Sequence, residues 1–269
     1  MKIRSLMVIL YLVVTVAGHN SWAQQWQQER YDIRWIPITE PEVERQVRAN
    51  SKDAVALYRL WWRARYQDKK EAYFNALRTL KEQQPGNAVA LSTYCAVLVD
   101  CRDYGRTPSE QGMSDFGTQR VRELLEQAKK LDPSLWMNYF AESKLVVYDN
   151  SPSVRTVQQL KAARKAYALA PQLSYTNTQL GYALLSEAMA HDRRLIDSAI
   201  SIYKRAQHLK PVDSGPSFLL LNVHRYVSPN RSEEQKTVRT LLSTIPPGVK
   251  LNAKLQRLLV QYKIPYKGR

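Results

Sequence analysis

Four prolines recur along this chain, and each one follows a stretch with helical periodicity and precedes another. They are Pro85, Pro133, Pro171 and Pro211, at intervals of 48, 38 and 40 residues. Proline cannot continue a helix, so these positions mark helix ends. A break that recurs every roughly 20 to 50 residues is typical of solenoids built from pairs of helices. The chain is therefore expected to be all-α, without a ladder of strands.

The apolar spacing between these breaks predicts helices over most of the chain. A first helix is expected to begin at Thr39, with a hydroxyl N-cap, a proline in the first turn and a glutamate three residues later. Residues 105–117 contain four glycines or prolines and are expected to form a loop. The other predicted helices cover residues 54–66, 72–80, 88–104, 118–131, 134–148, 153–169, 174–190, 194–209, 215–227, 231–243 and 251–262.

One stretch carries small and large apolar residues in a fixed order. Leu180, Gly181 and Leu184 lie on one helix, and the next helix has small, aromatic and small residues before a closing proline; these are Ala199, Tyr203, Ala206 and Pro211. This order resembles the tetratricopeptide repeat, with about six extra residues between the two helices. Earlier stretches match it in part, through Ala163, Ala166 and Pro171; Val121, Leu125, Ala128 and Pro133; and Ala72, Ala76, Leu80 and Pro85.

The resemblance covers residues 54–228. It implies a right-handed superhelix of antiparallel helix pairs, with a concave groove that binds a peptide or a protein segment. The small residues of the second helix let the next helix approach closely, while the large residue fills the space beside it. The intervals between the prolines depart from the strict repeat length, so this groove is open to distortion or filling.

Residues 1–23 have the composition of a secretory signal peptide. Lys2 and Arg4 precede an apolar run from Leu6 to Ala17, and Ser21-Trp22-Ala23 gives a small-x-small cleavage site. The apolar run is too short to span a bilayer, so cleavage after Ala23 and a secreted or periplasmic location are predicted, and an integral membrane protein is not. Removal of two of the 40 basic residues and none of the 24 acidic ones leaves a net charge of 38 − 24, or +14.

Signatures of catalysis are weak. The glycines at 112 and 117 have phosphate-loop spacing, but Thr118 and Gln119 occupy the places where that loop needs a lysine and a hydroxyl. The histidines have no second ligand at metal-binding spacing. No catalytic residue, cofactor or metal is predicted, and an enzyme is the third hypothesis, behind two kinds of binding protein.

Cysteines and aromatic residues each allow two interpretations. Cys95 and Cys101 are six positions apart, which is too far for a disulfide on one continuous helix, so packed thiols are favoured over a bond that needs the helix to end near Asp100. Tyr58, Trp61, Trp62 and Tyr66 form either a ligand platform or packing between helices. Packing is favoured, although Trp61 and Trp62 point about 100° apart and cannot both face the core.

The C-terminal region is basic. Residues 235–269 contain eight basic residues and no acidic one. A solenoid cap needs polar residues, but it does not need charges of a single sign. The alternative is a dock for an anionic lipid, polymer or protein. The residues that would make this contact are Lys250, Lys254, Arg257, Lys263, Lys267 and Arg269.

The chain thus divides into a signal peptide (1–23), an extended arm (24–38), helical repeats (39–228) and a basic helical cap (229–269). The leading hypothesis is an exported, non-enzymatic scaffold that holds a protein partner. The alternative is a protein that docks on an anionic envelope surface through its basic end. Nucleic acid is disfavoured as a partner because export is predicted.

Overall fold

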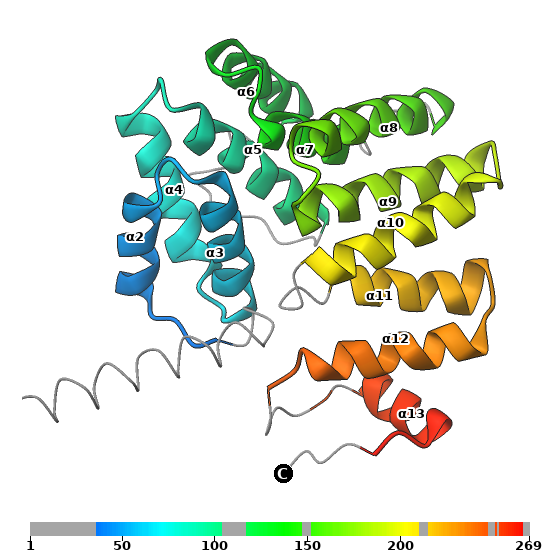
Figure 1. The fold of residues 1–269 in the computed structure, drawn as a ribbon. Coiled ribbons are helices and arrows are strands. Elements are labelled where there is room, and N and C mark those ends of the chain that lie inside the picture. The colour runs from blue at the N-terminus through cyan, green and yellow to red at the C-terminus, as the bar shows by residue number, and fades with distance from the viewer. Residues whose placement is uncertain are drawn as a thin grey trace, which may run out of the picture.

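The computed structural model describes residues 36–103, 117–146, 152–209, 215–246, 251 and 253–265, and all regular elements in these ranges are helical (Figure 1). They are α2 (Glu40–Ala49), α3 (Ala54–Tyr66), α4 (Lys70–Gln83), α5 (Ala88–Asp103), α6 (Thr118–Leu131), α7 (Trp136–Leu145), α8 (Pro152–Leu169), α9 (Ser174–Ala190), α10 (Leu195–Leu209), α11 (Gly215–Asn222), the π-helical turn η4 (Val223–Val227), α12 (Arg231–Ser243) and α13 (Ala253–Tyr262). The predicted all-α class is confirmed.

The helices pack as consecutive pairs: α3 with α4, α5 with α6, α7 with α8, α9 with α10, and α11 with α12. The first helices of successive pairs also touch, since α5 contacts both α3 and α7, and α9 contacts both α7 and α11. Figure 1 shows α9 to α12 following one another down one side of the molecule. This is the stack of helix pairs that the resemblance implied, with α2 added against α3 and α4, and α13 against α12.

The two helices of a pair differ in how they are buried. Every residue of α5 from Ala90 to Cys101 is buried. Its partner α6 buries a single stripe of Val121, Leu124, Leu125 and Ala128 and exposes its charged side chains except the half-buried Lys129. A helix buried all round lies between neighbours, whereas an amphipathic one covers them from outside. The first helix of the pair is therefore internal and the second is external.

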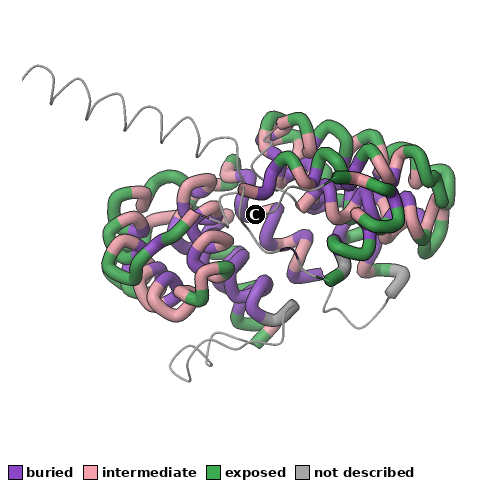
Figure 2. The backbone as a smooth tube through the Cα atoms, turned by 90° about the horizontal axis from the view of Figure 1, so that it is seen from below, coloured by how far each residue is buried: buried purple, intermediate pink, exposed green. Residues whose placement is uncertain are grey.

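The core is divided in the way expected of a repeat protein. One cluster of buried apolar side chains extends from Ile38 to Ala170, a second joins α8, α9 and α10, a third joins α10 to α11 and η4, and a fourth joins α11, α12 and α13. Figure 2 shows buried residues on the sides where helices face one another and exposed residues along the outer sides of the helices. Each cluster joins elements that are neighbours in the stack.

Local hydrogen bonds fix several helix ends. The carboxylate of Asp53 accepts the backbone N–H groups of Val55 and Ala56 at the start of α3. Asn230 accepts the N–H of Glu233 in the same way at the start of α12. Between α3 and α4, Asp68 has a φ of 59°, the left-handed conformation that reverses the chain.

Most predicted helices agree with the structure within two residues, and the differences have local causes. Thr39 is the N-cap residue of α2, but its hydroxyl makes no capping hydrogen bond, so that part of the prediction was wrong. The helix expected at 134–148 begins later, as α7 at Trp136, because Asp132 and Asn138 hold the preceding turn through hydrogen bonds; residues 147 and 148 lie outside the described residues. The helix expected at 215–227 changes to π geometry at Val223.

Candidate functional site

The residues that carry the repeat resemblance are packing residues. Leu180, Gly181, Leu184, Ala199, Tyr203 and Ala206 are all buried at the α9–α10 contact and at its neighbours. Gly181 lies against the ring of Tyr203, where an added Cβ would be 2.7 Å from Cε1. Pro211 lies outside the described residues. These side chains position helices, and no ligand could reach them without moving a helix.

The basic C-terminal residues are described only in part. Arg257 projects from the exposed side of α13, and Lys263 is exposed just beyond its end with a φ of 51°. Leu251, Leu255, Leu258 and Tyr262 are buried on the opposite side. Lys250, Lys267, Arg269 and the side chain of Lys254 lie outside the part of the chain that the structure describes.

Asp100 is the acceptor for donors from two other helices. It is fully buried on α5, and its carboxylate accepts hydrogen bonds from the Tyr58 hydroxyl at 2.8 Å and the Trp61 indole N–H at 3.0 Å, both on α3. The ammonium of Lys144 on α7 forms an ion pair with the same carboxylate. We call Tyr58, Trp61, Asp100 and Lys144 the inner cluster.

The electrostatics of the inner cluster are those of a tightly buried pair. Burial, and then the nearby Arg65, lower the pKa of Lys144 below its usual range. The contact with the Asp100 carboxylate opposes that change, since an opposite charge favours the protonated amine. The donors on α3 in turn stabilise the charged carboxylate. The cluster therefore joins α3, α5 and α7 through the fully buried carboxylate of Asp100.

Aromatic rings extend this contact to α9. The Tyr58 ring meets Phe140 of α7 and Tyr175 of α9 edge-on, with centroids 5.1 Å apart in both cases. The internal helices of the first four pairs thus meet through their own side chains at this level. The resemblance implied a groove along these helices, and at this level the rings of Tyr58 and Tyr175 bring α3 into contact with α9. Tyr58 and Trp61 are buried between helices, as favoured from the sequence, and Trp62 is half-buried, but Tyr66 is exposed.

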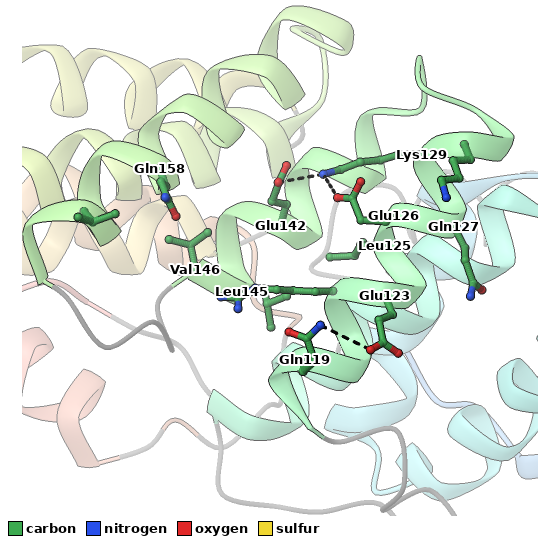
Figure 3. Close-up of a pocket in the computed structure, with 13 residues that line it drawn as sticks. Gln119, Glu123, Leu125, Glu126, Gln127, Lys129, Glu142, Leu145, Val146 and Gln158 are labelled. Atoms are coloured by element: carbon green, nitrogen blue, oxygen red, sulfur yellow. Dashed lines mark hydrogen bonds and ion pairs between the residues drawn. The ribbon is translucent and has the colours of Figure 1, made fainter.

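A hollow lies elsewhere, between the external helices α6 and α8 (Figure 3). Its volume is about 890 Å³. α6 forms one wall, the Glu142, Leu145 and Val146 side of α7 forms the floor, and Val154 and Gln158 of α8 form the other wall. A second hollow, of about 790 Å³, shares Lys129, Glu142, Val146 and Gln158 with the first and continues along α8. We call the two together the α6–α8 groove.

The two walls of the groove differ in charge. On the α6 side, Lys129 forms ion pairs with Glu126 at 2.8 Å and with Glu142 at 2.9 Å. Burial alone would lower the pKa of Lys129, but these hydrogen bonds outweigh it and raise the pKa. On the α8 side, Lys161, Arg164 and Lys165 line the groove without an acidic neighbour on their own helix. The lining residues carry six basic and three acidic side chains, for a net charge of +3.

This groove was missed from the sequence. Its walls come from residues 119–130 and 154–165, and the periodicity of each helix says nothing about which outer faces stay apart. The one sequence feature that could have pointed to it is the charge of α8. Its sequence PSVRTVQQLKAARKAYAL has four basic residues and no acidic one.

In the described ranges, no group of three or more histidine, cysteine or acidic side chains could hold a metal ion. The two cysteines are buried free thiols, and burial raises the pKa of Cys101 to about 12. Within the described ranges, no helix has the length and apolarity needed to cross a membrane.

His224 is a buried titratable group in the π-helical turn η4, with 4% of its surface exposed. Burial, and then Lys204 of α10, lower its pKa, while Glu233 and Glu234 of α12 and the backbone of Ser228 oppose this only in part. The folded protein thus holds a neutral ring at a pH where the unfolded chain, with a pKa near 6.5, takes up a proton. Stability from this group is present above that pH and is lost as the pH falls below it.

Replacing His224 by phenylalanine should therefore flatten the pH dependence of stability. We expect the free energy of unfolding of the wild-type protein to fall more steeply than that of His224→Phe as the pH is lowered from about 7 to about 5. Urea denaturation at a series of pH values measures the difference. His208→Gln, at an exposed position of α10, is the control. Parallel profiles for wild type and His224→Phe would contradict the assignment.

Together, the consecutive helix pairs, the internal and external helices and the cluster-by-cluster core define a class: an all-α, TPR-like helical-repeat protein. Searches of protein-family models and of curated proteins found no match. Among solved structures, the chain is similar to a thermophilic TPR protein from Thermus thermophilus, with 16% sequence identity and a TM-score of 0.43 over 76% of this chain and 89% of that one. The class rests on the packing of this chain's own helices.

Proposed function

We propose that this protein is an exported binding scaffold that holds a segment of a partner protein in the α6–α8 groove and catalyses no reaction. The observation that carries the proposal is the groove itself, a hollow of about 890 Å³ between two external helices, with Glu142, Leu145 and Val146 at its floor. Ligand sites are typically concave surfaces that combine apolar area with a few polar groups and are largely formed before binding.

The construction of the groove supports a preformed site. Its floor is α7, which is held from beneath by the ion pair between Lys144 and Asp100. α7 packs extensively against α8, which is its partner, and against α5, which is the partner of α6. A site on packed helices loses little freedom when a partner binds, so more of the interaction energy appears as affinity.

Export is proposed from residues 1–23, whose basic, apolar and small-x-small segments match a cleavable signal. The expected product begins at Gln24 in a secreted or periplasmic fraction. Mass spectrometry of the protein recovered from the envelope measures its N-terminus. Recovery of the uncleaved chain from the cytoplasm would contradict export and leave the binding proposal untouched.

Site-specific crosslinking tests the binding proposal. A photoreactive amino acid at Gln158, which lies in both hollows, should crosslink a partner in native extract. The same amino acid at Gln256, on the exposed side of α13, is the matched control. Capture of one protein from Gln158 and not from Gln256 supports the groove. Equal capture from both positions would contradict it.

The basic C-terminal end is the second candidate, because Arg257 and Lys263 are exposed and residues 235–269 have no acidic residue. In this alternative the repeats only position α13, and α13 docks on an anionic lipid or polymer. Reversal of both charges, by Arg257→Glu and Lys263→Glu, should then abolish sedimentation with anionic vesicles. Binding through this end should also weaken steeply between low and physiological salt, because exposed charges are screened.

A further inference from the structure

The α8 wall is unlike the other external helices in its charge. α2 and α6 compensate basic residues internally, through pairs such as Arg45 with Glu42 and Arg120 with Glu123. α8 has four basic residues and no acidic one. Lys161, Arg164 and Lys165 stand three and four positions apart, which puts like charges side by side on one face. All three are exposed, so this arrangement is maintained without an intrahelical counter-charge.

Aromatic and aliphatic side chains lie beside these cations. Tyr139 of α7 is half-buried in it, and the ammonium groups of Lys129 and Lys165 lie on either wall, each 5.7 Å from the centroid of its ring. Further along α8, Val154 of the groove lining and Val157, which lies one turn away outside the lining, are 50% and 57% exposed. One helix face therefore carries an apolar end and a basic end, and from Val154 to Lys165 it spans about 16 Å at helical rise, the length of roughly five extended residues.

We propose that the α6–α8 groove selects a protein segment with clustered aspartate or glutamate residues beside an aliphatic side chain. The carboxylates lie against Lys161, Arg164 and Lys165, and the aliphatic side chain lies against Val154 and Val157. This inference rests on the proposed function and adds the chemistry of the partner. The chain's own C-terminal region cannot be the occupant, because residues 235–269 contain no carboxylate side chain.

Charge complementarity favours a protein segment over a lipid surface. The three cations line a concave hollow, in which a narrow chain can place several carboxylates at once, whereas a flat bilayer reaches only its rim. On the opposite side, three basic residues are balanced by Glu123, Glu126 and Glu142, so the net positive charge of the lining lies on the α8 wall. A segment is therefore held in one register, which a uniformly basic surface would not impose.

The test uses the whole mature protein and a short fluorescent peptide in which two leucines precede a run of glutamates. Fluorescence anisotropy should show binding, and a peptide with glutamine in place of glutamate should bind at least about tenfold more weakly, a difference of about 1.4 kcal/mol. The variant Lys161→Glu/Arg164→Glu/Lys165→Glu should lose at least about tenfold in affinity for the glutamate peptide.

A matched control removes the effect of net charge. Lys52→Glu/Arg193→Glu/Arg239→Glu changes the same number of charges at exposed positions outside the groove and should bind nearly as tightly as wild type. Equal losses for the two triple variants would overturn the proposal, as would equal binding of the glutamine peptide. Binding of phosphatidylglycerol vesicles or single-stranded DNA without binding of the peptide would also overturn it. If Gln158 crosslinks a partner but the glutamate peptide fails, the scaffold stands and only the acidic selectivity falls.

Discussion

Replacing Asp100 by alanine should lower the free energy of unfolding by about 3–5 kcal/mol. The carboxylate is fully buried and accepts hydrogen bonds from Tyr58 and Trp61 besides its ion pair with Lys144. Alanine leaves the ammonium of Lys144, the hydroxyl of Tyr58 and the indole N–H of Trp61 without the acceptor that Asp100 provides. Removing one partner of a buried ion pair costs far more than the intact pair contributes, because the remaining charge is not solvated.

Urea denaturation followed by circular dichroism measures this change, with a lower midpoint as the expected result. Asp100→Asn keeps an acceptor oxygen and should fall between alanine and wild type. Glu42→Ala breaks the exposed pair with Arg45 on α2 and should hardly change the midpoint, since exposed pairs contribute little. A loss below about 1 kcal/mol for Asp100→Ala would mean that water or another donor set replaces the cluster, and that α3, α5 and α7 are joined by apolar packing alone.

The inner cluster also bears on the groove. Lys144 and Glu142 lie on different faces of α7, one toward Asp100 and the other toward Lys129. If Asp100→Ala loosens α7, the floor of the α6–α8 groove changes with it. Asp100→Ala should then weaken the binding of the glutamate peptide even though no residue of the inner cluster lines the groove. Unchanged affinity in protein that remains folded would show that the two sites are independent.

Helix positions could be predicted from the sequence because their signals are local. Apolar residues at helical spacing and prolines at the breaks placed α6, α9 and α12 to the residue. The π-helical turn at Val223 could not be found in this way, because its sequence has no local helix breaker. It lies where α11 and η4 pack against α12, so it is a product of tertiary contact.

The candidate site could not be predicted because its parts are distant in the sequence. Asp100 lies in the apolar run of α5, and this signals a buried charge in need of a partner. It does not indicate that the partners are Tyr58 and Lys144, which lie 42 and 44 residues away. The groove likewise depends on how far α6 and α8 stand apart over α7. The repeat signature at Gly181 and Tyr203 pointed to the packing between helices, and packing is what these residues do.

The effect of Gly181→Ala on the free energy of unfolding should change sign when Tyr203 is also replaced by alanine. Tyr203→Ala removes a fully buried aromatic ring between α9 and α10 and should cost about 3–5 kcal/mol. Gly181→Ala places a Cβ 2.7 Å from Cε1 and 2.8 Å from Cδ1 of that ring, inside contact distance, and should cost about 1–3 kcal/mol. In the Tyr203→Ala background the obstacle is gone. Gly181→Ala should then stabilise by up to about 1 kcal/mol, the helix-propensity gain of alanine over glycine.

Tyr203→Phe separates the ring from its hydroxyl. The hydroxyl is buried without a hydrogen-bond partner in the described parts of the chain, so its loss should be neutral or stabilising. The ring remains in Tyr203→Phe, so Gly181→Ala should still destabilise there. Denaturation midpoints of the six proteins give two double-mutant cycles. A Gly181→Ala penalty that persists in Tyr203→Ala would mean that glycine is needed for the backbone of α9, and that the close approach of the α10 ring is not its reason.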